Sequence, residues 1–240
     1  GSLLPNMWDE WRKDPESPLA KGQLDEAWMY TSQYGFIAWK QTHPIFRDGR
    51  VRRAMTLACD RPRIVSTLRL GKGKVITGPH HLASACCPPD LEPLPFDLAQ
   101  AKALLEEAGW KDADNDGVLE KDGRKLRFTV IYPNTSVTYQ KMLPVIKEDM
   151  KKAGVQMELL GIEWSVLVKR LEEKQFDACA LGWTGTLKPD PSQLWHSSGA
   201  NQNASSNHIG FVNKQADELI ERIRVCFDAS ERTKLYHEFH

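Results

Sequence analysis

The sequence predicts an α/β fold, a mixed and mostly parallel sheet flanked by helices. Two observations support this prediction. Between residues 126 and 183, segments typical of strands alternate with longer segments whose apolar residues recur at helical spacing, and helical crossovers of this kind favour parallel pairing. The last strand segment, 176–183, is almost wholly apolar, which is typical of a strand buried on both faces.

The alternating region contains three strands and two helices. Strands are predicted over 126–132, 155–159 and 176–183. The first helix is predicted over 136–153, and Pro144 is expected to kink it or to move its start further along the chain. The second helix has one apolar stripe, formed by Trp164, Leu167, Val168 and Leu171.

Further helices are predicted on either side of this region. Apolar spacing predicts helices over 50–59 and 62–70, and Asp97 begins another as an N-cap with Gln100 three residues on. Two helices over 214–227 and 230–240 follow the apolar strand and close the chain.

The first forty residues differ in character from the rest. Residues 3–40 contain three prolines and four tryptophans, so we expect an irregular segment that lies over the body of the protein. Alternation within it predicts one strand over 34–39.

Composition excludes several classes of partner. The chain has 32 basic and 32 acidic residues and no long run of either sign, so nucleic acid is not an expected partner. No apolar run approaches the roughly 18 residues of a membrane span. Five scattered cysteines do not resemble a disulfide framework, and Cys179 is expected to be a buried apolar residue. His80, His81 and Cys86 are weak candidates for a transition-metal site.

A polar turn follows the apolar strand and is the candidate ligand site, because open α/β sheets bind ligands at the carboxyl ends of their strands. An aromatic wall, hydroxyls, a glycine that permits close approach and a carboxylate occur together there. The alternative is that the tryptophans are core residues, the aspartate caps a helix and the histidine lies on the surface. The candidate residues are Trp183, Thr184, Gly185, Thr186, Asp190, Trp195 and His196.

An acidic stretch copies the first half of a calcium loop. Asp112, Asp114 and Asp116 alternate and are followed by Gly117, as in the first six positions of an EF-hand. The position that should hold a bidentate glutamate is Gly123, and a strand follows in place of an exit helix. A tight turn is therefore the main interpretation, and a bound calcium ion is the alternative.

The sequence does not predict an enzyme. It has no nucleophile elbow, phosphate-binding loop, dinucleotide fingerprint or zinc-protease helix. Two alternatives to a ligand-binding function remain: a calcium-stabilised interaction module built on the three aspartates, and a hydrolase using Ser197 or Ser198 beside His196. The hydrolase is the weaker of the two, because nothing in the sequence around these serines indicates an activated nucleophile.

Four motifs occur in an order that is similar to one protein family. The chain resembles the C-terminal lobe of the family 5 extracytoplasmic solute-binding proteins, the oligopeptide- and dipeptide-binding components of ABC importers. The motifs that carry the resemblance are 46–61, which reads FRDGRVRRAMTLACDR, then 96–110, then Phe176-Asp177 with Gly182-Trp183 and Asp190-Pro191, and finally 207–220.

The resemblance implies a two-lobed, periplasmic-binding-protein-like architecture that closes on an extended peptide or other small solute. It also implies that the protein delivers its solute to an ABC permease, acts as a monomer and needs no cofactor. The expected location is outside the cytoplasm, and the signal segment is not among the 240 residues. Residues 1–2 are typical of an expression scar, residues 3–40 resemble the crossover from a missing N-terminal lobe, and residues 41–240 correspond to a truncated C-terminal lobe.

One departure from the family pattern bears on the ligand. Peptide-binding members carry an aspartate after the Gly-Trp pair that holds the peptide's amino group, whereas the corresponding place here is Thr186 or Leu187. A buried ammonium without an anionic partner is costly. Either Asp190 substitutes for that aspartate or the solute is not a peptide with a free amino group.

Overall fold

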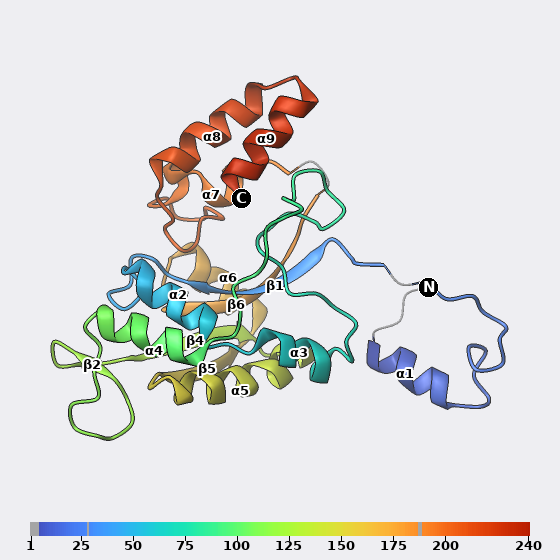
Figure 1. The fold of residues 1–240 in the computed structure, drawn as a ribbon, viewed down its shortest axis with the longest axis horizontal. Helices are drawn as coiled ribbons and strands as arrows, with labels where there is room; N and C mark the ends of the chain where they lie inside the picture. Colours follow the sequence, from blue (N-terminus) through green and yellow to red (C-terminus); the bar gives the residue numbers. More distant parts are fainter. Residues whose placement is uncertain (1–4, 28, 187–188) are drawn as a thin grey trace. The chain divides into compact units, whose positions relative to one another are not determined.

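The structure is a computed structural model that describes residues 5–27, 29–186 and 189–240 (Figure 1). The chain divides into two compact units. The first combines Gly1–Thr31 with Arg61–Val75, and the second combines Ser32–Asp60 with Ile76–His240. All the candidate site residues that the structure describes belong to the second unit.

A four-stranded sheet forms the centre of the second unit, in the order β1-β6-β4-β5. Strand β4 pairs in parallel with both β5 and β6, whereas β1 is antiparallel to β6. The mixed, mostly parallel sheet is therefore confirmed, and the three predicted strands share it with the predicted strand near residue 34. The strands are β1 (Gln33–Trp39), β4 (Arg127–Pro133), β5 (Gln156–Ile162) and β6 (Ala178–Thr184).

Strand β6 is an internal strand, as its composition predicts. It lies between β1 and β4, and its first four residues, Ala178 to Leu181, are buried. Cys179 is 1% exposed, and burial raises the pKa of its thiol to about 12, so it is the inert buried residue that the sequence predicts.

The α-helices in the described part of the second unit accompany the sheet (Figure 1). Asp97 caps α4 as expected, accepting a hydrogen bond from the Gln100 backbone N–H at 2.8 Å. Ser136 and Asn213 cap their helices in the same way, and neither cap was predicted from the sequence. The helices are α2 (Gly49–Leu57), α4 (Leu98–Glu107), α5 (Val137–Lys152), α6 (Trp164–Glu172), α7 (Ser192–Trp195), α8 (Lys214–Val225) and α9 (Ala229–Phe239).

Pro144 lies inside α5, which is continuous from Val137. The prediction that this proline would move the helix start further along the chain is wrong, because the Ser136 cap fixes the start eight positions earlier. Helices α2 and α4 contact each other, as do α8 and α9, and a small hairpin joins β2 (Glu120–Lys121) to β3 (Arg124–Lys125).

Apolar side chains fill both faces of the sheet. On one face, α6 contributes Leu167 and Leu171 to a cluster with Ile131, Cys179 and Leu181. On the opposite face, Phe128 packs edge-on against Trp39 and Phe46, with ring centroids 5.6 and 4.8 Å apart. Alternate residues of β6, among them Cys179 and Leu181, therefore face α6.

The first unit contains α1 (Pro5–Lys13) and α3 (Arg61–Leu68). The prediction of an irregular segment is wrong over α1, because proline is well tolerated at the first position of a helix, where no intrahelical N–H bond is lost. Around α1, the Trp8 indole donates to Glu26 at 2.5 Å, and the Lys72 ammonium lies 4.9 Å from the Trp8 ring centroid. Within the described part of the chain, no helix has both the length and the apolar character that crossing a bilayer requires.

The packing of α6 on the sheet gives a stability prediction. Leu167 is fully buried in the α6 cluster, whereas its neighbour Val166 is 45% exposed. We expect Leu167→Ala to lower the free energy of unfolding by about 2–5 kcal/mol. Val166→Ala is the matched control and should change it by less than about 0.5 kcal/mol. Urea unfolding followed by circular dichroism measures both, and equal effects would contradict this account of the core.

Candidate ligand-binding surface

The polar turn after β6 lies at the carboxyl end of the parallel strands, as predicted. Trp183 and Thr184 are still in the sheet, paired with Tyr34 and Gln33 of β1, and the Gly185 backbone N–H donates to the Ser32 carbonyl at 2.8 Å. Thr184 and Thr186 are exposed, and Trp183 and Gly185 are half-buried. The turn is thus tied to the start of β1 and presents two hydroxyls to solvent.

Gly185 approaches the protein's own backbone closely. A Cβ added there would lie 3.3 Å from the Pro79 carbonyl oxygen and 3.6 Å from that of Ser32. The prediction assigned this glycine a close approach to ligand. In the structure, Gly185 instead lies close to the Pro79 backbone, so the loop after residue 76 lies beside the turn.

Two aromatic side chains lie on the α6 side of the sheet at this edge, and a third residue, Trp164, begins α6. Trp183 is on the same face of β6 as Leu181 and Cys179, because side chains alternate along a strand. Its cross-strand partner Tyr34 is therefore on that face too, and α6 begins there with Trp164.

The strand order places the two tryptophans at the same end of the sheet. Strands β5 and β6 lie on either side of β4, and both run parallel to it. Trp183 lies near the end of β6, and Trp164 begins α6 two residues after the end of β5.

Sequence reasoning missed Trp164 and Tyr34. Trp164 was assigned to the apolar stripe of its helix, but it is 56% exposed, so it does not join the buried face. Tyr34 is half-buried, and this burial raises the pKa of its hydroxyl to about 12, so the phenol stays neutral. Tyr34 is located by its pairing with Trp183, and Trp164 by the position of β5 beside β4, and both facts need the sheet topology.

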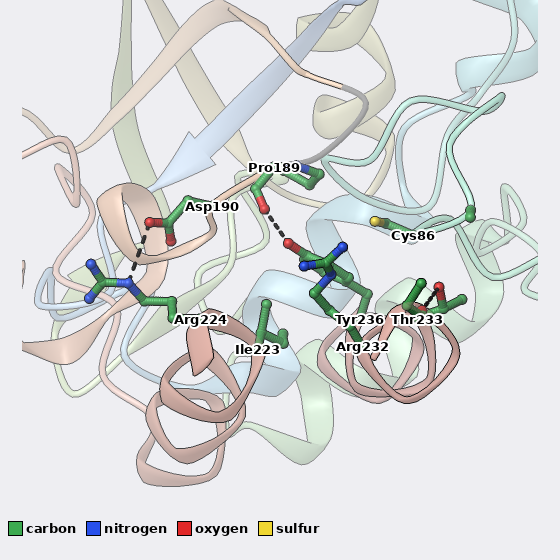
Figure 2. Close-up of a pocket in the computed structure, with 10 residues that line it drawn as sticks. Cys86, Pro189, Asp190, Ile223, Arg224, Arg232, Thr233 and Tyr236 are labelled. Carbon is green, nitrogen blue, oxygen red and sulfur yellow. Dashed lines mark hydrogen bonds and ion pairs between the residues drawn. The ribbon is translucent and has the colours of Figure 1, made fainter. Parts of the chain in front are cut away.

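Asp190 lies at the rim of a groove beyond the turn. One oxygen accepts a hydrogen bond from the Ser192 backbone N–H at 2.9 Å, and the other lies 3.6 Å from Arg224 Nε (Figure 2). Burial opposes ionisation, but Ser192 and Arg224 together lower the pKa of Asp190, so it is charged. Both side chains of the ion pair are more than half exposed, so the pair is weak and Asp190 can exchange Arg224 for another cation.

Trp195 and His196 are engaged in packing within the protein. The Trp195 ring meets Phe211 edge-on at 5.4 Å, and the His196 carbonyl accepts a hydrogen bond from the Asn207 side chain at 3.2 Å. These contacts hold α7 against the loop that leads to α8. The structure therefore brings Trp183 to Thr186 together at the sheet edge and joins Trp195 and His196 to a neighbouring cluster, where their role in binding stays a prediction.

His196 also contacts a serine and a carboxylate. Its Nδ1 lies 2.8 Å from Ser198 Oγ and 3.2 Å from the Ser198 backbone nitrogen, and its Nε2 lies 3.6 Å from Glu221. Because the same Nδ1 accepts the backbone N–H of Ser198, the contact caps the short 3₁₀ turn Ser197–Gly199. This geometry explains the serine contact without catalysis.

The three aspartates of the acidic loop converge at the other end of β4. Their ligand oxygens lie within 4.8 Å of one another, but Lys125 forms ion pairs with Asp114, at 3.2 Å, and with Asp116. The hydrogen bond from Lys125 lowers the pKa of Asp116. Gly117 N–H donates to Asp112 Oδ2 at 3.0 Å, so backbone and ammonium groups together satisfy much of the loop.

Two buried carboxylate oxygens in or near this loop accept no hydrogen bond within the described part of the chain. Among the described residues, Asp112 Oδ1 and Glu120 Oε2 are buried and have no hydrogen-bond partner. The three aspartates would hold a cation only if Lys125 moved aside. Because the loop precedes β4, it lies at the opposite end of the parallel strands from the aromatic side chains.

The weak transition-metal candidates form a different arrangement. His80 Nδ1 lies 2.9 Å from the Cys86 carbonyl oxygen, and burial, with His240 and His237 nearby, lowers the pKa of His80 to about 4. In the described ranges, the aspartate trio is the only group of three or more His, Cys, Asp or Glu side chains whose ligand atoms converge. His80 therefore acts as a neutral, buried packing residue.

Comparison with known proteins gives the family. Residues 4–205 match the family described as bacterial extracellular solute-binding proteins, family 5 Middle. The chain belongs to this family. It is 33% identical over 211 residues to the oligopeptide-binding protein AppA of Bacillus subtilis, covering 86% of this chain and 38% of that protein.

Solved structures of family 5 solute-binding proteins have the same fold. AppA from Bacillus subtilis in complex with a nonapeptide superimposes with a TM-score of 0.82 at 32% identity, covering 86% of this chain and 42% of AppA. NikZ from Campylobacter jejuni in complex with Ni(L-His) gives 0.81 at 22% identity, covering 98% and 50%. The chain spans less than half the length of the curated relatives that it matches.

The acidic loop gives a testable prediction about calcium. Lys125 and a calcium ion compete for the same oxygens. We therefore expect about 1 mM calcium to raise the thermal midpoint of the Lys125→Met variant. The response should exceed that of the unmodified chain, and adding Asp116→Asn should remove it. Differential scanning fluorimetry measures the midpoints. Unchanged midpoints in all three proteins would show that the loop is a turn that binds no ion.

Proposed function

We propose that this chain forms one wall of the solute-binding cleft of an ABC-importer binding protein. The protein captures a peptide or other small solute between two lobes outside the cytoplasm and delivers it to a membrane permease. Residues 3–40 are the crossover from the other lobe, and residues 41–240 belong to the C-terminal lobe. Hinged closure of the lobes accounts for the function without a chemical step.

The aromatic surface at the carboxyl edge of the sheet is the observation that carries this proposal. Trp183 and Tyr34 lie on the side of the sheet that α6 covers, and α6 begins with Trp164 at the edge where open α/β sheets bind ligands. A large side chain such as Trp164 that is half exposed is unusual in a core and common on a binding surface. The exposed hydroxyls of Thr184 and Thr186 add hydrogen-bonding groups beside it.

An extended peptide is the solute class that this surface supports best. Apolar aromatic faces accept varied side chains, and the relative AppA is known in complex with a nonapeptide. Thr186 has no charge to offer a ligand's amino group. Asp190, which is ionised and weakly paired, is the described anionic group nearest in sequence to the turn.

The proposal predicts that Trp183 is a binding hot spot. In the complete two-lobed protein, Trp183→Ala should weaken binding of a peptide ligand about tenfold or more, because an aromatic contact that is closed off from water contributes about 1.4 kcal/mol or more. Isothermal titration calorimetry with dipeptides, tripeptides and a nonapeptide measures the loss. Trp164→Ala should weaken binding in the same direction.

Phe227→Ala is the matched control. Phe227 is 94% exposed in the connection between α8 and α9, and it should leave peptide affinity unchanged. If Trp183→Ala binds as tightly as the unmodified protein, the sheet edge is not the ligand surface. If none of the peptides binds to the unmodified protein, the solute is of another class.

A further inference from the structure

A groove lies between the segment that follows the turn and the C-terminal helix pair. It has a volume of about 430 Å³ and is walled by α8 and α9, by Pro189 and Asp190, and by the loop that contains Cys86 (Figure 2). That size falls within the range of small-molecule sites. Pro189 follows Trp183 by six positions, so the chain keeps the groove within about 20 Å of the aromatic surface.

The walls of the groove are held in place by contacts within the second unit. The Tyr236 hydroxyl donates a hydrogen bond to the Pro189 carbonyl, which ties α9 to the segment after the turn (Figure 2). Tyr236 is 6% exposed and meets the His80 ring edge-on at 5.5 Å, so the loop after residue 76 is fixed to the same helix. Leu219, Ile223 and Leu235 pack α8 against α9. The groove is therefore formed before any ligand arrives.

The charged groups of the groove leave a positive excess. Asp190 is the carboxylate among the lining residues, and it faces Arg224 at 3.6 Å. Arg232 of α9 is the second cation. One of its nitrogens donates to the Cys226 carbonyl at 3.3 Å, and within the described residues no carboxylate forms an ion pair with it.

Arg232 lines the groove beside Tyr236. The two residues lie one turn apart on α9, so their side chains share one face of the helix, and both line the groove. Arg232 is half-buried, so its remaining N–H groups are partly shielded from water. A guanidinium presents these donors as a planar fork that matches the two oxygens of a carboxylate.

We propose that this groove binds a carboxylate of the solute through Arg232. This inference rests on the proposed function and deepens it: the preferred solute has an anionic group, such as a peptide C-terminus or an acidic side chain, within about 20 Å of the part that contacts Trp183. The Asp190–Arg224 pair forms the other end of the groove and limits how many negative charges it accepts.

The test uses the 240-residue chain itself, labelled with nitrogen-15, and two small probes. N-acetylglycine reproduces a peptide C-terminus with its carboxylate, and N-acetylglycinamide is the same molecule without the charge. At constant ionic strength, N-acetylglycine should shift the NMR signals of Arg232 and Thr233 saturably, and the amide should not. Arg232→Gln should weaken this binding about tenfold or more, as expected when a hydrogen bond to a charged group is lost.

Two further variants complete the design. Arg222→Gln removes an exposed arginine of α8 that does not line the groove, and it should leave the affinity unchanged. Arg232→Lys keeps the charge but loses the planar fork, so it should bind more weakly than the unmodified chain while keeping its fold. If Arg232→Gln alters the whole spectrum, the comparison between Arg232→Lys and the unmodified chain decides.

Several results would overturn the proposal. These are the absence of a saturable shift with N-acetylglycine, equal shifts with the amide, or equal affinity for Arg232→Lys. If singly charged inorganic phosphate bound more tightly than N-acetylglycine, the assignment of a carboxylate as the ligand group would be overturned. The assay measures binding to the groove alone. A negative result would therefore leave open whether the complete protein binds peptides, which the calorimetry tests separately.

Discussion

The pairing of β6 on both sides is the constraint on which the rest of the structure depends. A strand with neighbours on both edges and helices over its faces must be apolar until it leaves the sheet, and β6 is apolar from Ala178 to Leu181. Polar side chains can occur only towards the end of the strand and in the turn that follows. The candidate binding residues therefore begin at Trp183 and Thr184, the last two residues of β6, at the carboxyl edge of the sheet.

The sequence was sufficient to predict β6, the longer helices and the Asp97 cap, because these features depend on local composition and spacing. Asp97 acts as a cap through a bond to a residue three positions away, and the alternation of strands and helices favours the parallel pairing. The helix beginning at Pro5 was missed for a local reason as well. Proline was taken as a helix breaker at a position where it is a good first residue.

The parts of the site that could not be predicted depend on contacts between distant segments. The sequence assigns Trp164 to an apolar stripe, and only the order of the strands shows that it lies at the same end of the sheet as Trp183. Arg232 lies 42 positions after Asp190. Nothing in either stretch indicates that α9 returns to the segment after the turn through Tyr236. A groove between a loop and a helix pair has no signature in sequence spacing.

The distribution of charge along this surface separates two tasks that one residue could have performed. Thr186 leaves the turn itself neutral, so the edge of the sheet can hold apolar groups without the cost of burying an unpaired charge. The charged groups lie further along the chain, where Asp190 and Arg224 face each other and Arg232 has no carboxylate partner among the described residues. Under the proposed function, an uncharged contact at the edge would give affinity for many solutes, whereas a charge in a groove at a limited distance would select among them by length and by charge. Closure of a second lobe would remove water from both regions together, and the charged contact would then strengthen as the local dielectric constant falls.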